Sequence, residues 1–198
     1  AYGGLIDVAG LRGGDFVVVT AASSSVGLAA IQTANRVGAV PIAVTRRSAK
    51  RRRLLDAGAA HVIAAVEEED LKARLAAIAG PDGVRVVFDA VGGPAFDPLT
   101  AAMARGGILV EYGGLSPEPT PFPLPAVLGK SLTLRGYLMH EIVRDPARLA
   151  AAKAFILDGL ASGALRPVIA ETIPFERIVE AHRLLESNTR VGKIVVTL

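Results

Sequence analysis

The sequence has no cysteine and no tryptophan, and only 5% of its 198 residues are aromatic. The absence of cysteine excludes disulfide bonds and thiolate metal sites within these residues. No apolar run approaches the roughly 20 residues that a membrane-spanning helix needs, and no signal-peptide pattern opens the chain. We therefore expect a cytoplasmic protein with no membrane partner. Because the chain begins at Ala1 rather than at methionine, we also expect it to be part of a longer protein.

Charged residues make up 21% of the chain, and the formal net charge is only +3. The basic residues gather in the stretch RRSAKRRR, from Arg46 to Arg53. Such a cluster also occurs in nucleic-acid-binding proteins, but here no aromatic stacking platform accompanies it. We expect no nucleic-acid partner, and the cluster needs another explanation.

Apolar runs alternate with helix-like segments over the first 139 residues. Continuous β-branched runs are typical of strands that are buried on both faces. Strands that alternate with helices of this length pair in parallel through right-handed crossovers, which predicts a doubly wound α/β sheet. We expect strands at 15–21, 40–46, 61–65, 83–90, 107–114 and 131–139, and helices at 25–38, 48–58, 67–80 and 95–107.

The pattern changes after about Met139. A long helix is predicted at 145–163, followed by an extended segment at 166–173, a helix at 175–187 and a last strand at 192–198. The Pro-rich stretch 116–126 is predicted to be a loop at the carboxyl end of the sheet, where ligands bind in such folds. We divide the chain at this change, into residues 1–139 and 140–198.

The segment TAASSSVG joins the first strand to the first helix, where dinucleotide-binding proteins carry G-x-G-x-x-G. The three glycine positions read Ala22, Ser24 and Gly27. Gly27 keeps the close packing of helix on strand, and the hydroxyls of Ser23, Ser24 and Ser25 add donors beside the helix N–H groups. Anion binding needs those N–H groups and the helix dipole rather than glycine itself. A Ser-rich helix cap would look the same, so this turn alone leaves both interpretations open.

The end of the second predicted strand distinguishes the two interpretations. A site for NAD places Asp or Glu about 20 residues beyond the turn, to hold the ribose 2′-hydroxyl. Here the strand ends in Thr45, Arg46 and Arg47, and Lys50 follows. Cations bind a 2′-phosphate with charge-assisted hydrogen bonds, whereas a carboxylate repels it. The sequence therefore predicts NADPH, held by Arg46 and Lys50, while residues 51–53 are expected to form a solvated helix face.

The run from Thr20 to Ile63, together with VVFDAVGG, ILVEYGGLS, LTLRGY and VGKIVVTL, resembles the medium-chain dehydrogenase/reductase family over the whole chain. The subgroup it resembles most is the zinc-independent quinone oxidoreductases of the zeta-crystallin type. This resemblance implies a Rossmann-type cofactor domain and a C-terminal extension that belongs to a GroES-like substrate domain. With half of that cleft outside this chain, we expect the chain alone to bind NADPH weakly and to turn over poorly.

The resemblance also implies roles for particular residues. Lys50 matches a lysine at the 2′-phosphate, the serine turn matches the pyrophosphate loop, and the segments 91–93 and 111–114 match loops that line the nicotinamide. Asn188 and Lys193 match positions that reach the cofactor phosphates, although one subgroup has arginine at the former. The edge strand, at 131–138, implies a homodimer. The expected cofactor-binding residues are Ala22, Ser23, Ser24, Ser25, Val26, Gly27, Thr45, Arg46, Arg47, Lys50, Val91, Gly92, Tyr112, Gly113, Gly114, Asn188 and Lys193.

No catalytic triad, paired carboxylates or metal cluster stands out, and we predict no metal site. Of the three histidines, His61 is expected to pack, His182 to lie at the edge of a helix face and His140 to lie near the cleft. Asp89 could hold a ribose but is better explained as a turn cap, and Tyr112 could line the nicotinamide or simply pack. This sparseness suits hydride transfer, because the cofactor carries the chemistry.

Three functions remain open. The first is an NADPH-dependent reductase of quinones or other α,β-unsaturated carbonyl compounds. The second is another enzyme of the same fold, either a zinc alcohol dehydrogenase or the enoyl reductase of a polyketide synthase. The third is a non-catalytic nucleotide-binding module.

Overall fold

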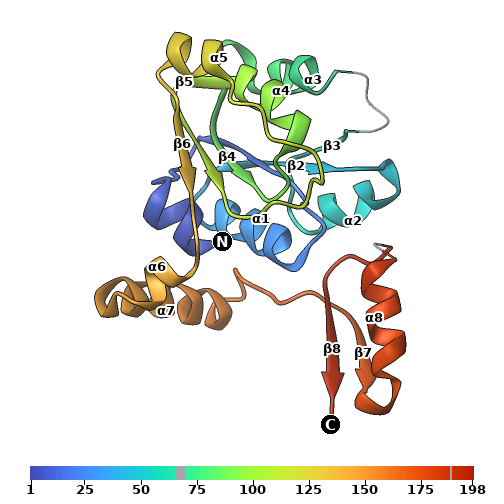
Figure 1. Ribbon diagram of the computed structural model, residues 1–198. Coiled ribbons are helices and arrows are strands. Elements are labelled where there is room, and N and C mark those ends of the chain that lie inside the picture. Colours follow the sequence, from blue (N-terminus) through green and yellow to red (C-terminus); the bar gives the residue numbers. More distant parts are fainter. Residues whose placement is uncertain (66–69, 188) are drawn as a thin grey trace.

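The computed structural model describes residues 1–65, 70–187 and 189–198. Its main body is a six-stranded, wholly parallel sheet in the order β3-β2-β1-β4-β5-β6 (Figure 1). The strands are β1 (Phe16–Val19), β2 (Val40–Thr45), β3 (His61–Ala64), β4 (Val84–Asp89), β5 (Met103–Glu111) and β6 (Thr133–Gly136). This confirms the predicted doubly wound α/β fold, with β6 at one edge of the sheet.

Helices cover both faces of the sheet, which explains the continuous apolar runs of its strands. Val17 and Val19 face a core built with η1 and α1, while Val18 between them faces a core built with α3 and α4. The helical elements of this part are η1 (Gly3–Val8), α1 (Ser25–Arg36), η2 (Ser48–Lys50), α2 (Arg51–Asp56), α3 (Leu71–Ala79), η3 (Gly80–Asp82), η4 (Gly93–Ala95), α4 (Phe96–Ala101) and α5 (Leu124–Lys130).

The remaining segment forms α6 (His140–Val143), α7 (Pro146–Ala161), β7 (Ile169–Pro174), η5 (Phe175–Arg177), α8 (Ile178–Glu186) and β8 (Lys193–Thr197). Strands β7 and β8 pair in parallel, and with α8 they form a small lobe apart from the main sheet (Figure 1). Helix α7 instead contacts the main body: Arg148 pairs with Asp7, and Arg36 pairs with Asp158 and lies 3.9 Å over the Phe155 ring. The division of the chain at residue 139 stays a prediction.

Several predicted boundaries are wrong, most clearly those of the helix at 95–107, the strand at 107–114 and the loop at 116–126. The helix expected at 95–107 ends at Ala101, because Met103 already pairs with Val84 as the start of β5. Gly106, at a φ of +69°, takes a left-handed conformation that breaks a helix, and the register of β5 on β4 shifts nearby. The loop expected at 116–126 ends early, since α5 begins at Leu124 after Pro123.

The sequence predicts that three acidic residues, 67–69, open the third helix. These residues lie outside the part of the chain that the structure describes. No helix within the described residues is long and apolar enough to cross a membrane.

Candidate cofactor-binding site

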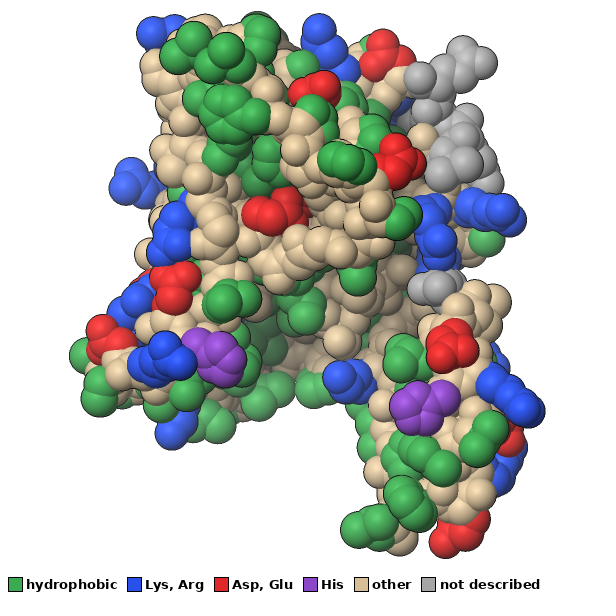
Figure 2. Space-filling view, viewed as in Figure 1, with side chains coloured by type: hydrophobic (Ala, Val, Ile, Leu, Met, Phe, Trp, Pro, Cys, Tyr) green, Lys and Arg blue, Asp and Glu red, His purple; other side chains and the backbone are tan. Residues whose placement is uncertain are grey.

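The carboxyl ends of the parallel strands meet the N-terminus of α1 where the strand order reverses between β1 and β4. Open α/β sheets bind ligands at this kind of switch point. Figure 2 shows that the molecule is hollowed between this edge of the main body and the small lobe. Most of the predicted site residues lie around this edge, on four separate connections.

The serine turn begins the site. Ala21 has a φ of +44°, a left-handed conformation that is uncommon for a residue with a Cβ, and it lets the chain reverse directly into α1. Ser24 caps α1, and its Oγ accepts a hydrogen bond from the Gly27 N–H at 3.0 Å. A Cβ on Gly27 would stand 2.6 Å from the backbone of Ala22, so the helix packs on the turn only with glycine there.

The basic end of β2 lies against this turn. Lys50 donates a hydrogen bond from Nζ to the Ser23 Oγ at 3.1 Å, although the two residues are 27 positions apart. Partial burial lowers the pKa of Lys50, and the positive charge of Arg46 lowers it further. Two neighbouring cations that repel each other are stabilised by a bound dianion such as a phosphate. Arg46 and Arg47 are exposed, whereas Thr45 is buried at the end of β2.

The loop after β4, residues 90–93, is held by Asp89. Its carboxylate is fully buried and accepts hydrogen bonds from the Thr20 hydroxyl, the Val91 N–H at 3.0 Å and the Gly92 N–H at 3.0 Å. The structure thus confirms that Asp89 caps a turn. At Gly92, with a φ of +64°, the loop takes a conformation that favours glycine.

The loop after β5, residues 112–120, lies along the loop after β4. The N–H groups of Leu115 and Ser116 donate to the carbonyls of Ala90 and Val91, and Thr120 Oγ1 accepts from the Gly93 N–H at 2.8 Å. The hydrogen-bonding pattern of the two strands therefore continues past the end of the sheet. Gly113 and Gly114 are exposed on this paired loop.

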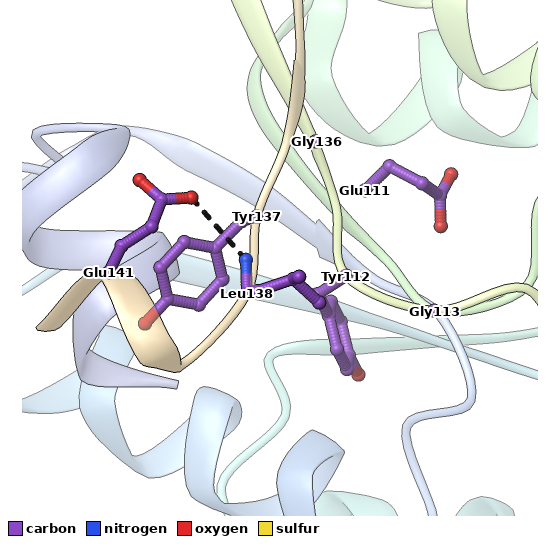
Figure 3. Close-up of a pocket in the computed structure, with 7 residues that line it drawn as sticks. All are labelled: Glu111, Tyr112, Gly113, Gly136, Tyr137, Leu138 and Glu141. Carbon is purple, nitrogen blue, oxygen red and sulfur yellow. Dashed lines mark hydrogen bonds between the residues drawn. The ribbon is translucent and has the colours of Figure 1, made fainter. Parts of the chain in front are cut away.

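A hollow of about 440 Å³ lies at the carboxyl ends of β5 and β6 (Figure 3). The ring of Tyr112 stacks on Phe88, with the centroids 4.0 Å apart, and its hydroxyl is buried without a hydrogen-bond partner among the described residues. Burial raises the pKa of Tyr112, and the acidic side chains of Asp89 and Glu111 raise it further. The lining residues are Glu111, Tyr112, Gly113, Gly136, Tyr137, Leu138 and Glu141.

The C-terminal segment reaches the serine turn through its backbone. The Gly192 N–H donates to the Ser23 carbonyl at 3.4 Å, which places the start of β8 beside the turn. Lys193, expected at the cofactor phosphates, has an exposed side chain on β8, and its N–H donates to the Val168 carbonyl. Asn188, expected nearby, lies outside the described residues.

The histidines do not gather. The expectation that His61 packs is wrong. His61 is the first residue of β3 and is exposed, because only the three residues after it in the strand are buried. His140 and His182 are exposed on α6 and α8. Within the described ranges, no three or more His, Asp or Glu side chains gather as metal ligands do.

Sequence reasoning missed several residues that shape the site. Thr20 and Ala21 open the serine turn TAASSSVG, and neither residue type by itself indicates a role in the site. The sequence indicates Glu111 only as the first residue of a strand-end loop, and the contact of Gly192 with Ser23 spans most of the chain. A polar residue at the end of an apolar strand is the signal that identifies Asp89, and the same signal applies to Glu111.

A model of the family described as zinc-binding dehydrogenase matches residues 25–156. The chain belongs to this family. The match begins with α1 and ends within α7, and it includes the basic end of β2 and both strand-end loops. The predicted membership of the medium-chain dehydrogenases/reductases is therefore confirmed at the level of the family.

Relatives of this chain carry several activities in their names. Acryloyl-coenzyme A reductase of Sulfurisphaera tokodaii is 30% identical over 98% of this chain and 54% of its own length. A crystal structure of Escherichia coli quinone oxidoreductase complexed with NADPH is 29% identical, with a TM-score of 0.87, over 100% of this chain and 61% of that one. A structure described as an NAD-dependent alcohol dehydrogenase is 30% identical, with a TM-score of 0.87, over 100% and 55%. The chain spans about half the length of its curated relative.

Proposed function

We propose that this chain is the cofactor-binding part of an NADPH-dependent oxidoreductase that reduces a quinone or another α,β-unsaturated carbonyl compound. The observation that carries the proposal is the contact of Lys50 with Ser23. It brings a lysine, with Arg46 beside it, to the turn at the N-terminus of α1. No acid occurs between Thr45 and Lys50, where an NAD site carries one.

The residues present fit this cofactor. The N–H groups of Ser25 and Val26 belong to the first turn of α1, where no intrahelical acceptor exists, and they point with the helix dipole toward an anion. Lys50 and Arg46 would hold the 2′-phosphate, and the loops around Gly92 and Gly113 would line the nicotinamide. When bound, NADPH supplies a hydride. The chain supplies position, charge complementarity and exclusion of water.

We favour a conjugated carbonyl as the acceptor, because such a compound is already electrophilic and accepts a hydride with little activation. The names of two relatives, an acryloyl-coenzyme A reductase and a quinone oxidoreductase, support this class. The hollow beside Tyr112, Tyr137 and Leu138 presents apolar surface that suits a flat acceptor.

A second candidate is an NAD-dependent alcohol dehydrogenase, which the solved structure of that description favours. The two candidates differ in the cofactor that the chain selects. They also differ in zinc, which an alcohol dehydrogenase of this fold would hold largely through residues outside this chain.

Titration with the two nucleotides tests the proposal. We expect NADPH to bind more tightly than NADH by about tenfold or more, because the two charge-assisted contacts to the 2′-phosphate are together worth about 1–3 kcal/mol at this exposed site. The fluorescence of the reduced nicotinamide reports both Kd values at equal ionic strength. Equal affinity for the two nucleotides would contradict the role given to Lys50 and Arg46 and favour the second candidate.

We also propose a homodimer through β6, which is the edge strand beside β5. Backbone pairing between two copies would protect the amides of residues 133–136 from hydrogen exchange at high protein concentration and release them on dilution. The mass in light scattering should then approach twice 20.5 kDa. Strand β3, at the opposite edge, is the internal control. If its exchange changes equally, or if the mass stays that of one chain, β6 is not the interface.

A further inference from the structure

Three acidic or hydroxyl side chains, those of Thr20, Asp89 and Glu111, lie in one row at the carboxyl ends of β1, β4 and β5. Asp89 and Glu111 are paired residues of β4 and β5, and Thr20 lies beside Asp89 because Val19 pairs with Phe88. Residues in register on parallel strands point to the same face. Two positions earlier, Val18, Val87 and Leu109 all belong to the core on the α3 and α4 side. The row thus continues that core as a polar layer beneath the two strand-end loops.

The two carboxyl groups of this row are unequal. Asp89 is satisfied by three donors, which hold the turn of residues 91–92 in place. Both carboxyl oxygens of Glu111 are buried, and neither has a hydrogen-bond partner among the described residues. Figure 3 shows that this carboxyl group points away from Tyr137 and Leu138, and so away from the part of the hollow beside β6.

Two buried carboxyl groups side by side do not both ionise. Three donors reach the carboxyl group of Asp89 and none among the described residues reaches that of Glu111, so Glu111 is the member of the pair that holds the proton. Burial, followed by the charge of Asp89, raises the pKa of Glu111 to about 8, while the nearby Gly113 N–H acts in the opposite direction. On the neighbouring strand β6, the residue paired with Glu111 is Gly136, which has no side chain. The uncharged Tyr112 faces the other side of the sheet.

We propose that Glu111 is a positioning residue for the cofactor. Its uncharged carboxyl group lies beside Asp89 and leaves that carboxylate free to hold the loop after β4. Ionised Glu111 would repel Asp89 and loosen the loops after β4 and β5, which line the nicotinamide in the proposed function on which this inference rests. The chain therefore binds the cofactor in the form that carries the proton, and loses affinity as that proton leaves.

The test compares NADPH binding to wild type and to Glu111→Gln between pH 7 and 9.5. Binding that needs a protonated group weakens above the pKa of the free protein, by up to about tenfold per pH unit. We expect the Kd of wild type to rise on the order of tenfold over this range. Glutamine stays neutral, so the variant should show only the smaller rise that deprotonation of Lys50 causes in both proteins. Coinciding pH profiles of the two proteins would overturn the proposal.

Thermal unfolding separates this inference from the proposed function. The pKa of Glu111 in the folded protein lies above its ordinary value. Its titration therefore lowers the free energy of unfolding of wild type as pH rises from about 4.5 to about 8, and lowers it no further above about pH 8. Glu111→Gln should therefore melt a few degrees higher than wild type at pH 8, with the gap closing at pH 5. Absence of NADPH binding in both proteins at pH 7 would contradict the proposed function. A difference in melting temperature between the two proteins that does not change with pH would instead contradict the protonation of Glu111.

Discussion

Replacement of Lys50 and Arg46 together by alanine should raise the Kd for NADPH roughly 10- to 100-fold and leave the Kd for NADH within about twofold. Each cation contributes a charge-assisted contact to the 2′-phosphate, which NADH lacks, and at this solvent-exposed site the two contacts together are worth about 1–3 kcal/mol. Lys50 also loses its hydrogen bond to Ser23. Fluorescence titration of both nucleotides at one ionic strength measures the change.

The matched control for this double variant removes the same charge from the same region. Arg52 and Arg53 lie exposed on α2, where Arg52 pairs with Asp56, and the sequence predicts a solvated face there. Figure 2 shows that Lys and Arg side chains gather on this side of the molecule, so a general electrostatic effect is a real alternative. Equal losses in Arg52→Ala/Arg53→Ala would show that the whole cluster, rather than two contacts, attracts the nucleotide. Loss of NADH binding in the first variant would show that the turn itself was damaged.

Replacement of Gly27 by alanine should both destabilise the fold and weaken cofactor binding. The added Cβ would lie 2.6 Å from the Ala22 Cα and carbonyl oxygen, which are backbone atoms that cannot rotate away. Helix α1 must then move off the turn, at a cost of about 1–3 kcal/mol in the free energy of unfolding. The same shift displaces the N–H groups of Ser25 and Val26, so we expect NADPH affinity to fall about tenfold or more.

Urea unfolding of Gly27→Ala measures its free energy of unfolding, and nucleotide titration of the same preparation measures its Kd for NADPH. The matched control is Gly129→Ala on α5, where nothing lies within 4 Å of the added Cβ. Its stability should stay level or rise slightly, since alanine loses less conformational entropy than glycine in a helix. A Gly27→Ala protein as stable as the control would mean that α1 does not pack on the turn as described.

The fold was predictable because most of its elements are encoded by local patterns. Buried parallel strands such as β1 and β2 are continuous β-branched runs, and the helices between them carry apolar spacing and end at glycine, as α1 does before Gly38. Prediction failed where tertiary pairing outweighed local propensity. MARGG reads as the end of a helix, yet Met103 gains more by pairing with Val84 in the sheet.

Sequence alone determined the sheet of alternating strands and helices, and it placed a serine turn and a basic strand end in adjacent units of the chain. These features depend on residues close together in sequence, whose propensities and charges can be read directly. Only the tertiary structure decided that Lys50 contacts Ser23, that Gly192 returns to the same turn, and that Thr20, Asp89 and Glu111 share one row. The physical reason is that strand register is a long-range choice, fixed by the packing of both sheet faces at once. The donors that this packing brings to Asp89 but not to Glu111 then decide which carboxyl group keeps its proton.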